Sequence, residues 1–581
     1  MPSSAEFVQR VVHAIGTGEG SAWVKRGVSL LGILAIVVTF MYNFRGLATS
    51  QAMDQAQIGR SLASGHGWRT QYARPISVAQ LQRHGRNVPQ QIWFDTYNAP
   101  LPPLLNAIAL FPVKSRLAPN PGSAIYIGDR LIVFLAMLLL LGSIVIQFFT
   151  AWRLFDRRLA LLACVLILFC DTLWQYSVSG LPQMLLLFLF NGTLYALVRA
   201  LEAKYQGGAV GPWLAAVGAG FGLLALTHGL TIWIFVPALI FMAFFFEPRG
   251  WAAALVLAVF LALYLPWLIR TWIVCGNPAG IALYSALDGL GGHTEMGWMR
   301  QAAFSLTGVG PGALREKIIA NLILQMGRIF EYLGSSVVAA MFFVSLLHLF
   351  RRNETAILRW MLLAMWAGAV IGMAAFGLKE ELGYSANQLH LLFIPLMTCY
   401  GLAWLLVQWN RLDIPGQLAR IGFLVLLFIL TVFPMGNSLY EMLLGSPKIT
   451  VHWPPYAPPL ISNLNTWMKP EEITASDMPW AIAWYANRRS LLLPETVKAM
   501  LDLNDYGILG SPVLSVYLTP VSGGENKLND IVRGEYSDWS SLILQTADMS
   551  KSPFKWGTLE LGYDRECAFL SDHDRHPRTA P

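Results

Sequence analysis

The sequence predicts a mainly α-helical, polytopic membrane protein with a small external α/β domain at its C-terminal end. Three observations lead to this fold class. The 581 residues are 55% hydrophobic and only 13% charged, with a mean hydropathy of +0.50, whereas a soluble globular chain carries about 25% charged residues. Apolar segments recur along residues 27–436. From Thr450 onward the composition becomes mixed and charged, and no spanning segment follows.

The first apolar segment follows a mildly amphipathic N-terminal stretch that ends in Lys25-Arg26. No small-residue cleavage site comes after it, so it is expected to remain as a signal anchor. Several later segments are shorter than the roughly 20 residues that a straight span requires, and the pair at 213–247 is compatible with a tight hairpin. About eleven segments can be drawn in total, at 27–44, 129–151, 159–176, 181–200, 213–227, 230–247, 251–270, 332–350, 357–377, 390–409 and 418–436.

The basic residues of the short loops predict the orientation of these segments. Lysine and arginine gather in the cytoplasmic loops of membrane proteins, which explains the net charge of +7 without a nucleic-acid partner. With the basic turns inside, the N-terminus is cytoplasmic, and residues 45–128, 271–331, 378–389 and everything after about 437 are external. The residues that set this orientation are Lys25, Arg26, Arg153, Arg157, Arg158, Arg199, Lys204, Arg249, Arg351, Arg352, Arg411 and Arg420.

The external loop at 45–128 is where chemistry is expected, because it is large and polar and lies between membrane helices. Asp54 lies in the sequence AMDQAQIGRSLASG, which predicts a short helix at the membrane surface that Gly65 ends. A carboxylate there is suited to accept a proton from an acceptor hydroxyl while a lipid-linked donor approaches from the bilayer. The same residue is also compatible with a surface acid that pairs with Arg60 or caps a helix.

The C-terminal tail is expected to form a separate unit. Residues 471–476, 490–494, 513–520 and 558–563 have the composition of short strands, and residues 480–487, 495–505 and 528–545 that of helices. Strands that alternate with helices predict a small α/β domain. We therefore divide the chain into a transmembrane catalytic domain at 1–436 and an external, periplasmic α/β domain at 437–581, connected by the proline-rich sequence HWPPYAPPL.

Four stretches resemble the polytopic glycosyltransferase C superfamily, in the branch of the protein O-mannosyltransferases and the lipid A aminoarabinose transferase. The first is the Asp54 loop, with AQIGRSLASGHGW following. The second is the proline turn NAPLPPLLNA, and the third is YLPWLIRTWIVCGNPAG at 264–280. The fourth is NQLHLLFIPLM, which begins a late helix. Together with the expected topology, these motifs cover most of residues 27–410.

The resemblance implies an inverting transfer of a sugar from a polyprenyl-phosphate donor, in a bacterial inner membrane, with Asp54 as the general base. The donor phosphate needs cationic or hydrogen-bonding neighbours. Arg270 is the first candidate, with Arg60 and His390 behind it. Arg270 is also compatible with an interfacial, snorkelling arginine, and His390 with a helix-end histidine. The further substrate-binding candidates are Asp95, Tyr97, Asn98, Gln183 and His228.

The sequence also departs from this family's pattern. Gln55 follows Asp54 where many relatives carry glutamate, which weakens the argument for a metal held between paired carboxylates. No cofactor is therefore expected, although Asp95 supplies a second acid in the same loop. Pro100 and Leu101 occupy the positions where aminoarabinose transferases carry an acid and a lysine, so the role of that lysine is not transferred to this chain.

Two other functions are compatible with the sequence. A lipid or polysaccharide transporter would use the polar loops as gates, and inverted repeats or broken helices would favour it, but no convincing repeat is found. A membrane-anchored assembly or sensor protein would leave the outer loop and the PWLIR motif without a role. The transferase hypothesis explains more features, with a protein, lipid or glycan as the acceptor.

Overall fold

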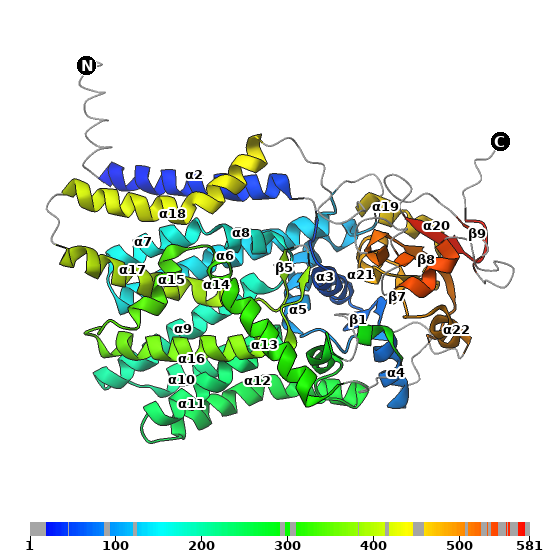
Figure 1. Ribbon diagram of the computed structural model, residues 1–581, viewed down its shortest axis with the longest axis horizontal. Helices are drawn as coiled ribbons and strands as arrows, with labels where there is room; N and C mark the ends of the chain where they lie inside the picture. Colours follow the sequence, from blue (N-terminus) through cyan, green and yellow to red (C-terminus); the bar gives the residue numbers. More distant parts are fainter. Residues whose placement is uncertain are drawn as a thin grey trace, which may run out of the picture.

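The computed structural model describes the polypeptide from residue 19 to residue 575, with gaps. The residues described are 19–44, 46–85, 93–119, 125–290, 297–302, 309–381, 383–412, 417–444, 458–505, 509–523, 531–532, 536–543, 554, 556–557 and 567–575. A bundle of helices forms one part of the molecule, and a small sheet with short helices forms the other (Figure 1).

Six helices within the described residues are long and apolar enough to cross a membrane, so the chain is a multi-pass membrane protein. The α9 and η5–α17 helices lie at the centre, with 72% and 78% of their apolar windows buried, whereas α12 and α18 are peripheral, with 17% each. The six helices are α6 (Ile127–Leu154), α9 (Gln183–Gln206), α12 (Trp251–Cys275), α16 (Asn353–Phe376), η5 with α17 (His390–Phe393 and Ile394–Arg411) and α18 (Gln417–Leu444).

Further apolar helices are short or bent, or, like α2, have only a short apolar part, at Leu30–Tyr42. The segment expected at 159–176 consists of two helices, α7 and α8, that meet at 53° and count together as a seventh span at most. The pair expected at 213–247 forms the predicted hairpin, in which α10 and α11 are joined by the 3-10 turn η2. The bounds are α2 (Glu19–Asn43), α7 (Arg157–Leu168), α8 (Asp171–Val178), α10 (Gly211–Thr227), η2 (Gly229–Thr231) and α11 (Ile232–Phe245).

The segment expected at 332–350 is not one continuous helix. Instead, α14 (Ile329–Tyr332) is followed by a tight turn and by the nine-residue α15 (Val337–Ser345). The turn passes through two residues with positive φ, Gly334 at 77° and Ser335 at 50°. A side chain at Gly334 would meet Cys170 Sγ at 2.6 Å, so the backbone approaches α8 closely at this break.

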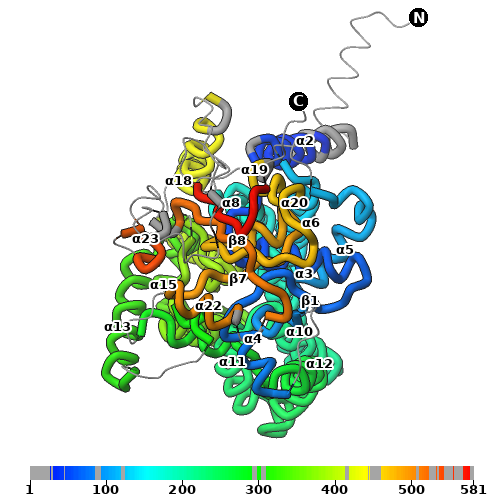
Figure 2. The backbone as a smooth tube through the Cα atoms, turned by 90° about the vertical axis from the view of Figure 1, so that its right-hand side faces the viewer, coloured from blue at the N-terminus to red at the C-terminus, as the bar shows by residue number. Residues whose placement is uncertain are grey.

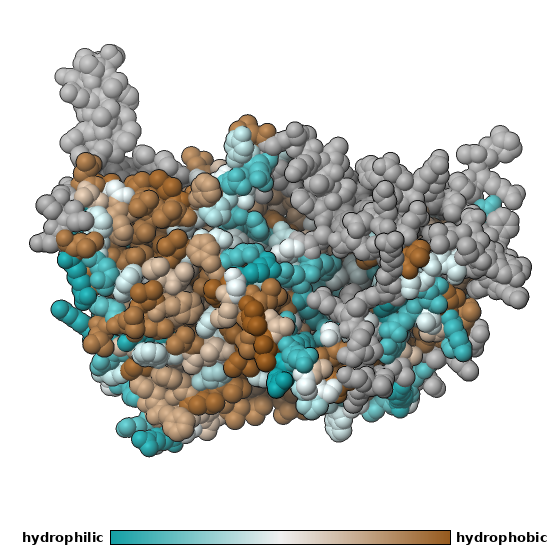
Figure 3. Space-filling view, in the orientation of Figure 1, coloured by the Kyte–Doolittle hydropathy of each residue, from teal (hydrophilic) through white to brown (hydrophobic). Residues whose placement is uncertain are grey.

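The basic turns gather at one end of the helix bundle. Arg153 Nη1 donates to Glu202 Oε2 at 2.9 Å, and Arg352 Nη1 donates to the Arg153 carbonyl at 2.9 Å. Lys204 Nζ donates to the carbonyl of Phe245. The ends of α6, α9 and α11 and the start of α16 therefore meet there. Apolar residues cover much of the bundle beside them, and polar residues become frequent toward the opposite end (Figure 3).

At that opposite end, the first outer loop folds into short helices and strands next to the tail. Thr49 caps α3, since its Oγ1 accepts from Ala52 N at 3.2 Å. Gly59 lets α3 pack on α5, because a Cβ there would lie 2.7 Å from the Asn106 Cβ. The loop elements are α3 (Ser50–Ala63), β1 (Arg69–Thr70), β2 (Tyr72–Ala73), α4 (Pro75–Arg83), β3 (Trp93–Phe94), α5 (Leu101–Leu110) and η1 (Phe111–Arg116).

Other outer segments complete this end of the molecule. The second large loop contains α13, which packs on α16, and the hairpin of β4 and β5 lies between α16 and η5. Their bounds are η3 (Ala282–Leu287), η4 (Gly297–Arg300), α13 (Pro311–Gly327), β4 (Glu380–Glu381) and β5 (Tyr384–Ser385).

Among the described residues, the tail strands belong to a six-stranded mixed sheet in the order β2-β7-β6-β8-β10-β9. Its first strand comes from the outer loop, because Tyr72 and Ala73 pair in parallel with Ser490 and Leu491. The sheet therefore joins the two domains predicted from the sequence (Figure 2). The tail strands are β6 (Ile473–Ser476), β7 (Arg489–Leu492), β8 (Val513–Leu518), β9 (Trp556–Gly557) and β10 (Ala568–Ser571).

The tail helices agree in part with the predicted ones. Residues 480–487 form α21 and the π-helical turn η6, and α22 lies within 495–505. The helix expected at 528–545 appears only as η9 and α23 among the described residues, and the strand expected at 558–563 lies outside them. The bounds are α19 (Pro458–Ser462), α20 (Leu464–Trp467), α21 (Pro479–Ala481), η6 (Ile482–Ala486), α22 (Val497–Asp505), η7 (Pro520–Gly523), η9 (Ser537–Trp539) and α23 (Ser540–Ile543).

Candidate functional site

Asp54 lies in the second turn of α3 and is only 1% exposed. Its Oδ2 accepts from Arg74 Nη2 at 2.5 Å and from Asn98 Nδ2 at 2.7 Å. Its Oδ1 accepts from Gln57 Nε2 at 3.0 Å. These three donors, from α3 and from two later parts of the loop, fix the orientation of the carboxylate.

The short helix predicted around Asp54 is confirmed by α3, most of whose residues are buried. Ser50, its first residue, donates from its backbone N and its Oγ to Glu381 Oε2, at 2.9 and 2.8 Å. A carboxylate at a helix N-terminus is stabilised by the helix dipole. Beyond its C-terminal end, Gly65 has a φ of 80°, as its predicted role at the helix end requires. The β4–β5 hairpin therefore holds the helix that carries Asp54.

Asp95, the second acid of the loop, lies beside Asp54. Asp95 Oδ1 lies 3.8 Å from Arg74 Nη1 and accepts from Asn98 Nδ2 at 3.2 Å. Its Oδ2 accepts from the backbone N of Asn98 at 2.9 Å. Burial and the negative charge of Asp54 raise the pKa of Asp95 to about 6. Two carboxylates thus share one arginine and one amide.

Arg74 is the central cation of this cluster, and it was not among the residues predicted from the sequence. It occupies the junction between β2 and α4 and is 4% exposed. Its guanidinium carbon lies 4.1 Å from the centre of the Tyr72 ring and 4.3 Å from that of Tyr97. Arginine between two aromatic faces is held by cation–π contacts. An arginine just before a proline-initiated helix was the signal available in the sequence.

A cavity of about 380 Å³ opens next to this cluster, and we call it the membrane-side cavity. Tyr97 and Asn98 form part of its wall, so Asn98 contacts both the cavity and Asp54. Aromatic residues and the tip of the α10–α11 hairpin provide much of the remaining wall. The lining includes Gln51, Thr96, His228, Trp233, Tyr264, Trp267, Thr271, Lys379 and Asn387.

Besides Tyr97 and Asn98, two more of the predicted substrate-binding residues lie in or beside this cavity. His228 is in its wall, and its Nδ1 accepts from Leu230 N at 3.3 Å. Arg270 belongs to α12 between the lining residues Trp267 and Thr271, and its Nη1 donates to the Asp95 carbonyl at 3.0 Å. Lys379, also in the wall, pairs with Asp288. Cationic groups therefore lie on the α12 side and on the β4 side of the cavity.

Three other predicted residues make contacts outside the membrane-side cavity. Gln183 Nε2 donates to the carbonyls of Ser385 and Ala386, at 3.2 and 2.8 Å. His390 is fully buried, and its Nδ1 accepts from Trp366 Nε1 at 3.0 Å. Arg60 Nη1 donates to the Trp484 carbonyl at 2.6 Å. Each of these contacts connects separate parts of the fold.

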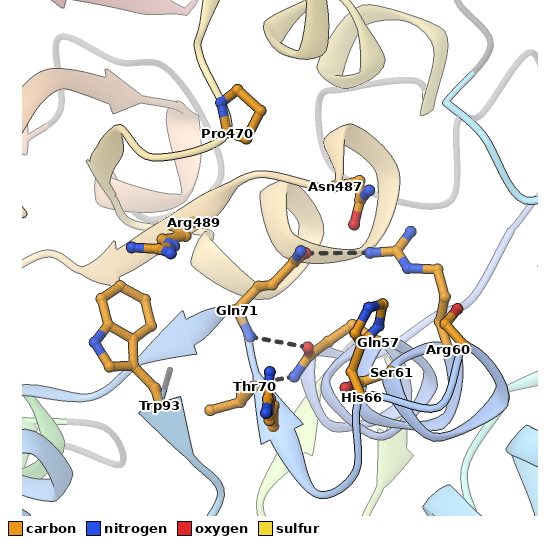
Figure 4. Close-up of a pocket in the computed structure, with 12 residues that line it drawn as sticks. Gln57, Arg60, Ser61, His66, Thr70, Gln71, Trp93, Pro470, Asn487 and Arg489 are labelled. Atoms are coloured by element: carbon orange, nitrogen blue, oxygen red, sulfur yellow. Dashed lines mark hydrogen bonds between the residues drawn. The ribbon is translucent and has the colours of Figure 1, made fainter. Parts of the chain in front are cut away.

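A second pocket, of about 290 Å³, lies on the other side of α3, between the outer loop and the tail (Figure 4). We call it the loop–tail pocket. Its lining residues are Gln57, Arg60, Ser61, Ser64, His66, Arg69, Thr70, Gln71, Trp93, Pro470, Asn487 and Arg489.

The described residues contain no group of three or more His, Cys, Asp or Glu side chains that is suited to a metal ion. Between Asp54 and Asp95, the positive charge is supplied by Arg74. The arrangement holds the carboxylates of Asp54 and Asp95 close together, and Asn98 connects Asp54 with the membrane-side cavity.

No protein-family model and no curated protein sequence matches this chain. Solved structures do match. ArnT from Cupriavidus metallidurans, bound to undecaprenyl phosphate, is 11% identical with a TM-score of 0.57, and the match covers 94% of this chain and 98% of that one. The Archaeoglobus fulgidus oligosaccharyltransferase, in complex with Zn and sulfate, is 15% identical with a TM-score of 0.50, over 87% of this chain and 69% of that one.

A second structure of the Archaeoglobus fulgidus enzyme, AglB, contains an inhibitory peptide and a dolichol-phosphate. It is 12% identical with a TM-score of 0.50, over 86% of this chain and 70% of that one. At such identities the likeness establishes the fold, and the arrangement of helices, outer loop and tail agrees with the resemblance found in the sequence motifs. This chain has the glycosyltransferase C fold of these membrane glycosyltransferases.

Proposed function

We propose that this protein is an inverting membrane glycosyltransferase that moves a sugar from a polyprenyl-phosphate donor to an acceptor hydroxyl on the external face. The hydroxyl oxygen attacks the anomeric carbon, and the bond from that carbon to the phosphate oxygen breaks. The hydroxyl proton passes to Asp54, and the polyprenyl phosphate leaves. Inversion follows because attack and departure occur on opposite faces of the sugar.

The observation that carries this proposal is the position of Asp54. Its carboxylate lies at the centre of a buried polar cluster. One side chain, that of Asn98, lies between this carboxylate and the membrane-side cavity. A general base must come within hydrogen-bonding reach of the proton that it takes. The acceptor hydroxyl is expected to replace the amide of Asn98 or Gln57 at the carboxylate.

The membrane-side cavity is the proposed donor site. Trp233, Tyr264 and Trp267 give it aromatic faces of the kind on which sugar rings and isoprenoid chains pack. Lys379 in its wall and Arg270 beside it are the proposed contacts of the donor phosphate. Lipids of the same chemical class, undecaprenyl phosphate and dolichol-phosphate, are bound in the structures of the two similar proteins.

The proposed orientation follows from the basic turns. They lie together at one end of the bundle, and the Asp54 cluster lies at the other. With the basic end in the cytoplasm, the N-terminus is cytoplasmic, and the site and the tail are external. The proposed location is a bacterial inner membrane. We propose that the reaction uses no metal ion or cofactor, and that Arg74 is the cation of the cluster formed with Asp54 and Asp95.

The Asp54→Asn variant tests the proposal. Transfer from labelled polyprenyl-phosphate sugars to an envelope lipid and glycan fraction should fall by a factor of about 10²–10⁴, the range for loss of a positioned general base. The amide keeps the size of the side chain and can still accept from Arg74.

Asp502→Asn is the matched control, because it makes the same change at an exposed position of α22. It should leave transfer unchanged. Full transfer by a folded Asp54→Asn protein would refute the assignment of the base. Movement of lipid between leaflets without any transfer product would refute the transferase itself.

A further inference from the structure

Three consecutive charged residues lie where the chain leaves α16 and enters β4. They are Lys379, Glu380 and Glu381, and we call residues 379–381 the strap. Lys379 has a φ of 55°, in the left-handed region that a residue with a side chain seldom adopts. Such a backbone conformation persists only where the surrounding contacts hold it. The side chains of the strap supply contacts of this kind on three sides.

The first strap residue reaches the wall of the membrane-side cavity. Lys379 Nζ lies 2.5 Å from Asp288 Oδ2, at the end of η3. The other oxygen of Asp288 accepts from Trp298 Nε1, which orients the carboxylate. Because Lys379 also lines the cavity, its ammonium group is held at the surface where the donor phosphate is proposed to bind.

The other two strap residues make contacts on opposite sides of β4, as neighbours in a strand do. Glu380 Oε1 and Oε2 accept from Arg328 Nη1 at 2.8 and 2.9 Å, and its Oε1 also accepts from Tyr332 OH at 2.9 Å. Glu381 accepts from the backbone N and the Oγ of Ser50. The strap therefore joins α14 to the first residue of α3.

Asp54 lies between two fixed ends of α3. At the N-terminal end, Glu381 holds Ser50, which lies one turn before Asp54 on the same face of the helix. At the C-terminal end, Arg60 donates to two carbonyl groups of the tail. Gln51, next to Ser50, lines the membrane-side cavity. The place of the Asp54 carboxylate beside the cavity therefore depends on how both ends of α3 are held.

We propose that the strap sets the distance between the donor phosphate and the base, and that Glu381 is a positioning residue that acts on Asp54 through α3. This role rests on the proposed transfer reaction, in which Lys379 contacts the phosphate and Asp54 accepts the proton. Lys379 and Glu381 are two positions apart in the sequence, so the contacts that they make cannot shift independently.

The geometry of the reaction gives this distance its importance. In-line attack places the acceptor hydroxyl, and with it the base, on the face of the sugar opposite the leaving phosphate. A displacement of about 1 Å in such an arrangement can lower the rate by a factor of about 10². A base on one element and a phosphate contact on another must therefore be held in register, and the strap connects the two.

The Glu381→Gln variant tests the positioning role. The amide keeps the size of the side chain but removes the charge that strengthens its hydrogen bonds to Ser50. For the full-length protein in phosphatidylcholine nanodiscs, the kcat of transfer should fall by a factor of about 10–100. The KM for a labelled polyprenyl-phosphate sugar should stay unchanged. An unchanged kcat would overturn the positioning role.

The neighbouring variant Lys379→Gln should give a different kinetic result. It removes a proposed contact of the phosphate, so the KM for the donor should rise about tenfold. Two substitutions that lie two positions apart would then act on different kinetic constants. An equal rise of the donor KM in Glu381→Gln would mean that the strap serves donor binding alone, and would overturn the positioning role.

A double variant separates positioning from a general loss of structure. If Glu381 acts through Asp54, adding Glu381→Gln to Asp54→Asn should change the residual kcat by less than a factor of about two, because residues that act as one unit are not additive. A general structural defect would lower the residual rate as much as it lowers the rate of the unmodified protein. That result would overturn the proposal.

Hydrogen exchange tests the contact without any transfer reaction. In Glu381→Gln, exchange should become faster at residues 50–57 of α3, and it should stay the same in α9. Glu316→Gln is the matched control, because it makes the same change at an exposed position of α13. It should alter neither the exchange of α3 nor kcat. Unchanged exchange at residues 50–57 in Glu381→Gln would show that Glu381 does not hold α3, and would overturn the proposal.

The same measurements distinguish this proposal from the proposed function. Faster exchange of α3 in Glu381→Gln, together with full transfer by Asp54→Asn, would refute the base and the positioning role, while the hold of the strap on α3 would stand. Loss of transfer in Asp54→Asn, together with an unchanged kcat in Glu381→Gln, would refute the positioning role alone.

Discussion

At the scale of single residues, the site consists of two acids that share one arginine. Asp54 and Asp95 come from positions 41 residues apart in the sequence, and Arg74 contacts both. The two carboxylates together carry more negative charge than the single guanidinium neutralises. Ionisation of the second carboxylate therefore lowers the stability of the folded state. Burial and the nearby negative charge of Asp54 both disfavour ionisation of Asp95, which is why the pKa of Asp95 is raised.

The raised pKa of Asp95 predicts a pH-dependent stability. Because the folded pKa of about 6 exceeds the usual 3.8, the folded state binds more protons than the unfolded state between these values. The stabilisation that protonated Asp95 contributes is therefore fully present below pH 3.8, and it is lost as the pH rises through about 6. Asp95→Asn cannot ionise, and at pH 7.5 it should raise the free energy of unfolding by up to about 3 kcal/mol.

The measurement is thermal unfolding of both proteins in detergent from pH 4 to pH 8. The difference in Tm should be largest above pH 7 and should shrink toward pH 4. Asp502→Asn, at an exposed position, should show no such trend. A Tm for Asp95→Asn that stays below that of the unmodified protein across the whole range would contradict this account.

At the scale of helices and strands, small residues determine how closely the membrane helices approach. Gly401 of α17 faces α15, and a Cβ at this position would overlap the carbonyl oxygen of Val338. Gly192 of α9 is different, since no atom lies within 4 Å of a Cβ built there. Glycine at a helix contact permits close backbone packing, whereas glycine without a contact only lowers helix propensity.

These two glycines therefore respond in opposite directions to alanine. Gly401→Ala should lower the free energy of unfolding by about 1–3 kcal/mol, because α15 and α17 must separate. Gly192→Ala should leave it unchanged or raise it by up to about 1 kcal/mol, through helix propensity. Thermal unfolding followed by tryptophan fluorescence in detergent measures both. Equal Tm values for the two variants would show that the α15–α17 contact tolerates a side chain.

At the scale of the whole molecule, the tail and the membrane part are joined around η6. Arg60 of α3 donates to two η6 carbonyls, at 2.5 and 2.6 Å. Asp129 of α6 accepts from Trp484 Nε1 at 2.7 Å and from Tyr485 OH at 2.8 Å. Parallel pairing of β2 with β7 extends the same junction. The loop–tail pocket depends on this junction, because its two walls belong to different sides of it.

The Arg60→Ala variant tests this junction. Hydrogen bonds to charged groups contribute about 1.5–3 kcal/mol each, so loss of the guanidinium should lower the local opening free energy by several kcal/mol. Hydrogen exchange should become faster in residues 479–493 while that of α9 stays the same. Arg116→Ala, which removes an exposed arginine of η1, should change neither region. Unchanged exchange at 479–493 in Arg60→Ala would mean that the sheet alone holds the tail.

The sequence by itself determined the membrane class, the order of most helices and the strands β6, β7 and β8, because hydrophobic periodicity and composition act locally. It also predicted the α3 helix around Asp54, through its composition and the glycine at its end. It did not separate the span expected at 332–350 into α14 and α15, since that break depends on the close approach of Gly334 to Cys170.

Only the tertiary structure decided which residues meet at the site. Arg74 and Asp95 lie 20 and 41 residues after Asp54 in a loop without hydrophobic periodicity, so no local pattern specified their distance. The pairing of β2 with β7 joins residues 418 positions apart. Such contacts form because the bundle and the tail hold the ends of the loop in place. Local sequence patterns describe segments, whereas a site assembled from several segments depends on how the whole chain packs.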